Sequence, residues 1–378
     1  GLQALYDNTT GAGNTAVGYG CLFNNEDGDN NTAMGLSALD ANTSGDHNAA
    51  FGKSSLGAAT TASKNSAVGS LTMSSTTTGA KNTAMGYGAL DQNTTASSNT
   101  GIGYLALTAN TEGGENVAVG YNSLAANTTA SYNTAVGYDA LAVCTGAQNV
   151  GVGRKALLAV TTGTANVGIG TNSGWSITTG VGNTCVGDGP LNVNTEGGNN
   201  TAIGRLAISL LTTGNNNSSL GSYAGDVTTT GSNNASLGYQ ADPSAADASN
   251  EVTLGNSSIS SIRCQVQTIS SLSDVRDKEN IEELPLGVEF INTLRPVKFD
   301  WAMRDGANKG VQEIGFVAQE LDKAQQNAEA EEYMRLVLKN NPDRLESTYG
   351  KLVPILTKAV QELSAEVEEL KQQLNQEE

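Results

Sequence analysis

The chain is poor in the residue types from which most enzymes are built. Of its 378 residues 15% are charged and 5% are aromatic, while 45 are glycine, a composition unlike that of a doubly wound enzyme. It lacks an apolar run long enough to span a bilayer, and no basic, apolar, small-residue series opens it. We therefore expect neither membrane insertion nor a secretion signal.

Basic charge, histidine and paired cysteine are also scarce. The net charge of −18 would repel nucleic acid, so we expect no nucleic acid partner. A single histidine, His47, excludes histidine zinc sites and a Ser-His-Asp triad. The cysteines show no CxxC spacing and are expected to be reduced and buried; they are Cys21, Cys144, Cys185 and Cys264. We expect no cofactor and no metal.

What the chain does have is a repeat, marked by a glycine four residues after an asparagine. Every step between these glycines is 17 residues except one of 16, between Gly137 and Gly153. The glycines are Gly18, Gly35, Gly52, Gly69, Gly86, Gly103, Gly120, Gly137, Gly153, Gly170, Gly187, Gly204, Gly221, Gly238 and Gly255. Gly1 has the same phase, so we expect further coils before it. Such a period predicts a parallel β-solenoid or β-roll shaft over residues 1–259.

Two apolar rows recur in each coil, counted from its asparagine. The residue three positions on is always apolar, as in Val17, and we interpret it as the core row. The residue before it is small, as in Ala16, which suits close approach of backbone or of a neighbouring subunit. A second row follows eight positions after the asparagine, beginning with Leu22. Two rows predict a thin core.

Two polar rows accompany them. The asparagines run from Asn14 to Asn234, with Glu251 in the last coil, and predict a ladder of stacked amides. Threonine recurs twelve positions after the asparagine, from Thr43 to Thr229, and is interpreted as a β-branched residue that stacks at a turn. A hydroxyl array that docks ice or a sugar is the alternative.

A solenoid with so thin a core is expected to gain burial from neighbouring chains. Fifteen coils rising about 4.8 Å each would form a rod on the order of 70 Å long. The coils, of the type Asn14-Thr-Ala-Val-Gly-Tyr19, resemble the head repeats of trimeric adhesins and of phage tail fibres. That resemblance implies a homotrimeric fibre.

The character of the sequence changes after residue 259. Residues 260–272 alternate and predict a neck strand, and from Ser273 charged residues and helix formers dominate a second, small α+β domain, 273–378. From about residue 350 the chain predicts a helix with apolar residues at alternating steps of three and four: Val353, Leu356, Val360, Leu363, Val367, Leu370 and Leu374. This heptad seam indicates a coiled coil with partner helices; an amphipathic helix lying on its own domain is the alternative.

Four ordered motifs in residues 273–378, SDxxxKENI, LRPVKFDW, IGFVAQE and YGKLVPILTKAVQEL, resemble the intramolecular chaperone domain of endosialidases and phage tail fibres, peptidase S74. The resemblance implies a homotrimeric module that aids folding of the β-shaft and cuts itself off at Leu272-Ser273. It assigns Ser273 as nucleophile and Lys278 as base, with Asp274 and Glu320 as positioning groups.

The Ser-Lys chemistry has a physical basis, because a lysine can activate a serine only when its environment favours the neutral amine. Asp277, directly before the lysine, stands where the family usually has an apolar residue. A carboxylate there favours the charged ammonium, so we expect a weaker base. Enzyme activity beyond one self-cleavage per chain is not expected.

The leading functional hypothesis is a bacteriophage tail fibre or spike, made in the host cytoplasm and located in the virion. Its expected partners are two further copies, other tail proteins, and a host receptor, a glycan or surface protein. Alternatives are a glycan depolymerase, whose paired carboxylates would come from scattered acids such as Glu112, Glu115 and Glu196, and a trimeric bacterial adhesin. A free-standing ice-binding rod is a further alternative.

Overall fold

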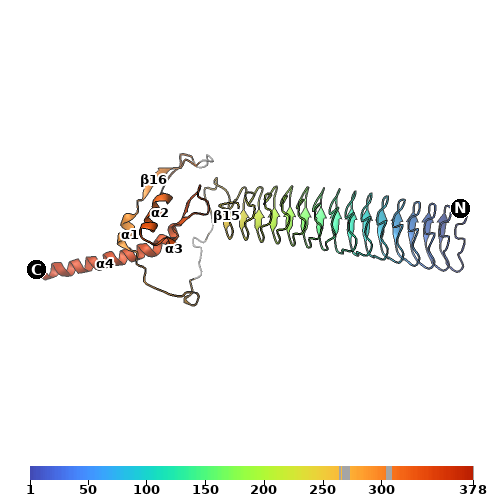
Figure 1. The fold of residues 1–378 in the computed structure, drawn as a ribbon, viewed down its shortest axis with the longest axis horizontal. Helices are drawn as coiled ribbons and strands as arrows, with labels where there is room; N and C mark the ends of the chain where they lie inside the picture. The colour runs from blue at the N-terminus through green and yellow to red at the C-terminus, as the bar shows by residue number, and fades with distance from the viewer. Residues whose placement is uncertain (264, 266–272, 304–308, 378) are drawn as a thin grey trace. The chain divides into compact units, whose positions relative to one another are not determined.

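The structure is a computed structural model that describes residues 1–263, 265, 273–303 and 309–377. It divides the chain into two compact units, Gly1–Asn256 and Ser257–Glu378, which are described separately (Figure 1). Most of the expected neck at 260–272 lies outside the described residues, as do Cys264 and Leu272.

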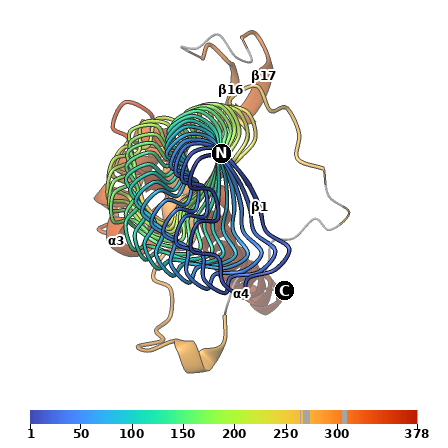
Figure 2. The same cartoon turned by 90° about the vertical axis from the view of Figure 1, so that its right-hand side faces the viewer.

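The first unit is a solenoid whose coils each contribute one three-residue strand to a single fifteen-stranded parallel sheet. Strands follow one another in chain order, and Thr83 of one strand pairs with Thr100 of the next. The strands are β1 Thr15–Val17, β2 Thr32–Met34, β3 Ala49–Phe51, β4 Ser66–Val68, β5 Thr83–Met85, β6 Thr100–Ile102, β7 Val117–Val119, β8 Thr134–Val136, β9 Val150–Val152, β10 Val167–Ile169, β11 Thr184–Val186, β12 Thr201–Ile203, β13 Ser218–Leu220, β14 Ala235–Leu237 and β15 Val252–Leu254. In Figure 2 successive coils follow nearly the same path with a progressive rotation. The predicted β-solenoid is confirmed.

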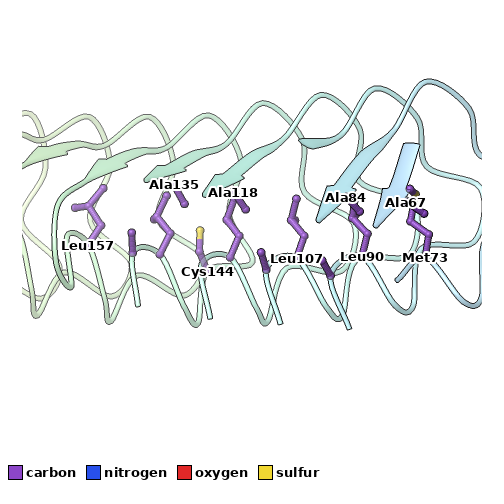
Figure 3. Close-up of a cluster of buried hydrophobic side chains, with 14 of the residues drawn as sticks. Ala67, Met73, Ala84, Leu90, Leu107, Ala118, Ala135, Cys144 and Leu157 are labelled. Atoms are coloured by element: carbon purple, nitrogen blue, oxygen red, sulfur yellow. The ribbon is translucent and has the colours of Figure 1, made fainter. Parts of the chain in front are cut away.

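The core lies on the opposite side of the strands from the one that the sequence pattern suggested. Ala118, the middle residue of β7, is fully buried, whereas Val119 is only partly covered. Figure 3 shows leucines of the facing wall, such as Leu107, beneath these strand alanines. The interpretation of the third-position residues as the core row was therefore wrong.

The width of the coil explains this arrangement. Side chains in a strand alternate between two faces, so either the middle residue or its two neighbours point inward. At Gly168, in the middle of β10, an added Cβ would lie 2.7 Å from Leu157 Cγ. The leucine row thus fills the coil so fully that only alanine, glycine, serine, threonine or cysteine occupies the middle position. The larger apolar residues are directed outward.

Tight turns on both sides of the strand keep successive coils in contact. Gly103 adopts φ +137°, and a Cβ there would lie 2.3 Å from the carbonyl oxygen of Gly120 in the next coil. The leucine row is also held in the left-handed region, with Leu107 at φ +53°. A bulky residue adopts this conformation only where the surroundings impose it, and here burial of the leucine side chain does so.

The predicted asparagine ladder is confirmed, and its oxygens bond mainly to the main chain. Asn99 Oδ1 accepts the N–H of Asn116 at 2.9 Å, and Asn116 Nδ2 donates to the carbonyl of Ala130 at 2.9 Å. The sequence reasoning missed a second, partial ladder eleven positions after the first asparagine. In it Asn110 Nδ2 donates to Asn93 Oδ1 at 3.1 Å and to the carbonyl of Gly113 at 2.9 Å.

The second ladder yields a test with opposite outcomes at two equivalent positions. Asn110 and Asn194 are both fully buried, but both side-chain amide atoms of Asn194 lack hydrogen-bond partners in the described shaft, where Ile177 and Leu211 flank it one coil away on either side. Asn110→Leu should lower the free energy of unfolding by about 1–3 kcal/mol because it leaves buried partners unpaired. Asn194→Leu should leave it unchanged or raise it. Denaturant unfolding of both variants measures this, and equal losses would contradict the ladder argument.

The threonine row is used inside the shaft. Thr94 Oγ1 donates to the carbonyl of Thr111 at 3.1 Å, and the same bond recurs from coil to coil. This supports the interpretation of stacked β-branched residues, because these hydroxyls are already bonded to the neighbouring coil rather than free to form an array for ice or sugar.

Cys21, Cys144 and Cys185 are reduced and buried, as predicted. Burial raises the pKa of the Cys144 thiol to about 11 and that of the Cys185 thiol to about 12, from 9.0. Because the unfolded thiols lose their protons first, the stability that they contribute is complete below pH 9 and falls as the pH rises toward 11 and 12.

We therefore predict that iodoacetamide at pH 8 leaves Cys144 and Cys185 unmodified in the folded chain and alkylates both in urea, because only the thiolate reacts. Peptide mass spectrometry measures this for each cysteine. Modification of either cysteine in the folded chain at the unfolded rate would show that its coil opens.

The second unit is a small α+β domain. Its elements are η1 Val275–Asp277, α1 Val288–Thr293, β16 Val297–Asp300, β17 Gln312–Gly315, α2 Ala318–Asn327, α3 Glu331–Met334, β18 Val337–Leu338, β19 Glu346–Ser347, η2 Tyr349–Lys351 and α4 Leu352–Glu377. Two antiparallel pairs, β16 with β17 and β18 with β19, accompany a core that includes Phe290, Leu321 and Met334.

Helix α4 carries two apolar stripes. Leu352, Ile355 and Ala359 are buried in the domain, and α1 packs against this helix. The predicted seam is a separate stripe, and every member of it is exposed, from Leu356 at 46% to Leu374 at 66%. The helix therefore does lie on its own domain, but with residues other than the heptad seam. None of the described helices is long and apolar enough to cross a membrane.

Candidate self-cleavage site

A single short turn at the start of the second domain brings Ser273 and Lys278 together. Asp274 is the N-cap of η1, and its carboxylate accepts the N–H of Arg276 at 2.9 Å. The turn ends at Lys278, whose backbone N–H donates to the carbonyl of Val275. An N-cap aspartate favours such a turn because it satisfies a backbone donor that the turn leaves free.

The turn places the lysine amine within hydrogen-bonding distance of the serine hydroxyl. Lys278 Nζ lies 2.6 Å from Ser273 Oγ and also donates to the Ser273 carbonyl at 3.2 Å. This is the contact that a lysine base needs to take the hydroxyl proton. The spacing of five residues that the sequence suggested is thus compatible with a direct hydrogen bond. Leu272, on the other side of the expected scissile bond, lies outside the described residues.

Ser273 and Lys278 are both exposed in the single chain. In water an ammonium group keeps its proton at neutral pH, and a lysine becomes an effective base only when its surroundings exclude water or favour the neutral amine. The single chain therefore supplies the contact between nucleophile and base but not the desolvation that the reaction needs.

The two carboxylates of the expected site are each held by an arginine. Hydrogen bonds from Arg276 lower the pKa of Asp274. Glu320, in the first turn of α2, forms a bidentate ion pair with Arg295. The hydrogen bonds from Arg295 lower the pKa of Glu320. Both are thus poor proton acceptors. Asp274 positions the turn of the Ser-Lys pair, whereas the hydrogen bonds of Glu320 among the described residues go to Arg295.

Sequence reasoning missed an arginine and a tyrosine that link the later motifs. Arg295, in LRPVKFDW, joins the end of α1 to α2 through Glu320, in IGFVAQE. Tyr349, in YGKLVPILTKAVQEL, accepts the Phe316 N–H at its hydroxyl oxygen at 3.2 Å. The available signal was the motifs themselves, because IGFVAQE supplies Phe316 and Glu320, and the two other motifs supply one partner to each of them.

Within the described residues no group of three or more histidine, cysteine, aspartate or glutamate side chains could hold a metal ion. Residues 273–329 match the family model for the chaperone of endosialidase, peptidase S74. The match begins at Ser273 and includes the Ser-Lys turn, Arg295 and Glu320. Comparison with curated proteins and with solved structures finds no match. The C-terminal unit of this β-solenoid chain therefore contains a segment, residues 273–329, that is similar to the peptidase S74 chaperone of endosialidase and starts at the serine of the candidate site.

Proposed function

We propose that this chain is the shaft of a homotrimeric tail fibre or spike of a phage, made together with its own C-terminal folding module. In this role the shaft serves host attachment, and the module at 273–378 brings three chains together and then separates by cleavage at Leu272-Ser273. The exposed heptad seam of α4 is the observation that carries the proposal, because the helix is anchored in the domain through Leu352, Ile355 and Ala359 and leaves this separate apolar stripe for partners.

Assembly of a repetitive solenoid requires a module that aligns the chains. Fifteen coils of nearly the same sequence can pair with neighbouring chains in several shifted registers, and long-range parallel β-structure nucleates slowly. A coiled coil that forms first aligns the chains at one end before the shafts assemble. The match to the endosialidase chaperone family supports this role.

The proposed cleavage is an acyl shift followed by hydrolysis. Ser273 Oγ attacks the carbonyl carbon of Leu272 and passes its proton to the neutral Lys278 amine, from which the proton goes to the departing Ser273 nitrogen. The C–N bond breaks and an ester forms, and water then hydrolyses the ester to a Leu272 carboxylate and free Ser273 hydroxyl. The 2.6 Å contact between Lys278 Nζ and Ser273 Oγ provides the path for the first proton transfer.

We predict that the intact chain releases a fragment of residues 273–378, whereas Ser273→Ala and Lys278→Met chains stay at 38.7 kDa on a denaturing gel. Loss of either group should reduce cleavage to background, because the serine provides the nucleophile and the lysine the base. Thr293→Ala is a suitable control, since this hydroxyl bonds within α1 to the carbonyl of Phe290. Light scattering on the same samples reports the oligomeric state.

If all four chains remain full length but trimeric, the module is a permanent cap, and Asp277→Leu is the next variant to examine. If the intact chain is monomeric at every concentration, the proposed fibre is wrong.

A further inference from the structure

The outer face of the fifteen-stranded sheet carries an apolar row along the whole shaft. This outer row consists of the third residue of every strand: Val17, Met34, Phe51, Val68, Met85, Ile102, Val119, Val136, Val152, Ile169, Val186, Ile203, Leu220, Leu237 and Leu254. None of them is buried, and Met85, Leu220 and Leu237 are half exposed. A continuous apolar surface of this length on a soluble protein marks an interaction site.

The strand residues that share a face with the outer row are uncharged. The first residue of each strand, which points to the same face, is threonine, serine, alanine or valine throughout. Directly after the marker glycine, Tyr87, Tyr104, Tyr121 and Tyr138 form a ladder of stacked rings with centroids 5.1–5.6 Å apart. Their faces cover one another, so the ladder presents ring edges and leaves few faces for a ligand to stack on. In other coils the position after the marker glycine holds a charged residue: Lys53, Arg154, Asp188 and Arg205.

Other rows of the coil carry negative charge. The exposed Glu112 and Glu196 occur thirteen positions after the asparagine and the exposed Glu115 sixteen positions after it, while the half-buried Asp40 and Asp91 occur nine positions after it. Two chains that each have a net charge of −18 would repel one another through such surfaces. The outer row and the first residues of the strands thus form an uncharged strip through which identical chains can meet.

We propose that the outer row is the surface by which the shaft packs against further copies of this chain, with the rows facing one another around a common axis in unshifted register. The inference rests on the proposed homotrimer and names the surface that holds its shafts together. The repeat itself identifies the partner, because a row with one apolar side chain per strand, about 4.8 Å apart, is matched along its length only by a surface with the same spacing. This chain supplies that spacing.

Two further features favour a parallel, unshifted arrangement. The exposed seam of α4 calls for copies of the same helix, and in parallel association the same ends of the shafts lie together. The tyrosine ladder occupies four successive coils, and the single 16-residue step follows Gly137 at its end. A shift by one coil would misalign both irregularities, so they distinguish the unshifted register from its neighbours.

Cross-linking of the full-length chain tests which row faces the partner. Val68→Cys places a thiol in the outer row, and Thr78→Cys places one at an exposed position elsewhere in the same coil. We expect a short bismaleimide to link Val68→Cys chains to one another through the introduced thiol at least tenfold more than it links Thr78→Cys chains through theirs, with the unsubstituted chain as background. Peptide mass spectrometry identifies the linked residues and so the register.

A charge variant provides a second readout. Met85→Glu sets carboxylates of adjacent copies against one another, whereas Thr95→Glu adds the same charge at an exposed position elsewhere in the same coil. The rate of backbone amide hydrogen exchange in the shaft should rise in the Met85→Glu oligomer and stay unchanged in the Thr95→Glu oligomer. Both substitutions are on the outside of the coil, so neither removes a core contact.

The outcomes separate this inference from the proposed function. Selective linkage at Val68→Cys in an oligomer supports both. An oligomer in which Thr78→Cys links as well as Val68→Cys, or in which Met85→Glu has no more effect than Thr95→Glu, overturns the outer-row interface and leaves the fibre intact. A chain that is monomeric before any substitution overturns both.

Discussion

Leu363→Lys together with Leu370→Lys in α4 is expected to abolish assembly of the full-length chain. Both leucines belong to the exposed seam, and neither is part of the domain core. Burial of one leucine side chain is worth about 1.5–3 kcal/mol, so loss of two in each of three chains removes on the order of 10 kcal/mol from the proposed trimer, before ammonium repulsion is counted. Light scattering should show monomers or irregular aggregates in place of trimers.

The matched control is Ala365→Lys together with Gln372→Lys. These residues are exposed on the same helix, on the side away from the seam, and they add the same charge. The control chain should assemble like the unsubstituted one. Equal loss of assembly in both chains would mean that charge on α4, rather than the seam, is responsible, and the coiled-coil interpretation would not survive. Far-UV circular dichroism of both chains verifies that the domain and α4 remain folded.

Gly103→Ala, at one of the marker glycines, is expected to destabilise the shaft strongly. The glycine has φ +137°, where an alanine is strained, and the new Cβ would lie 2.3 Å from the Gly120 carbonyl oxygen, a main-chain atom that cannot move alone. Backbone strain of this kind costs about 1–3 kcal/mol, and the clash adds to it. Hydrogen exchange should show loss of protection centred on the coils that contain these two glycines.

Gly114→Ala in the same coil is the control. Its φ is not in the left-handed region, and its added Cβ meets nothing closer than the Ser97 carbonyl oxygen at 3.2 Å. Protection from exchange should therefore change little. If both variants lose protection alike, the marker glycines are not special, and the close approach of successive coils would have to be explained in another way.

The Ser-Lys pair of the candidate site could be predicted from the sequence because its residues are close together in the chain. Ser273 and Lys278 are five residues apart, and the turn that joins them depends on Asp274, which lies between them. The environment of Glu320 could not be predicted from the sequence. Its partner, Arg295, is 25 residues away in the sequence and lies beside it only because α1 and α2 contribute to the same core. Whether Asp274 and Glu320 assist cleavage remains a prediction.

The sequence by itself determined the solenoid, its 17-residue period and the asparagine ladder, because each of these repeats along the chain and pairs a residue with its own counterpart one coil on. The tertiary structure alone decided which strand face is the core. Ala118 and Val119 are both apolar, and the pattern cannot show which of them points inward. The facing leucine wall settles it, since it packs closely against the middle residues of the strands, which are therefore small, and so directs the larger apolar residues outward.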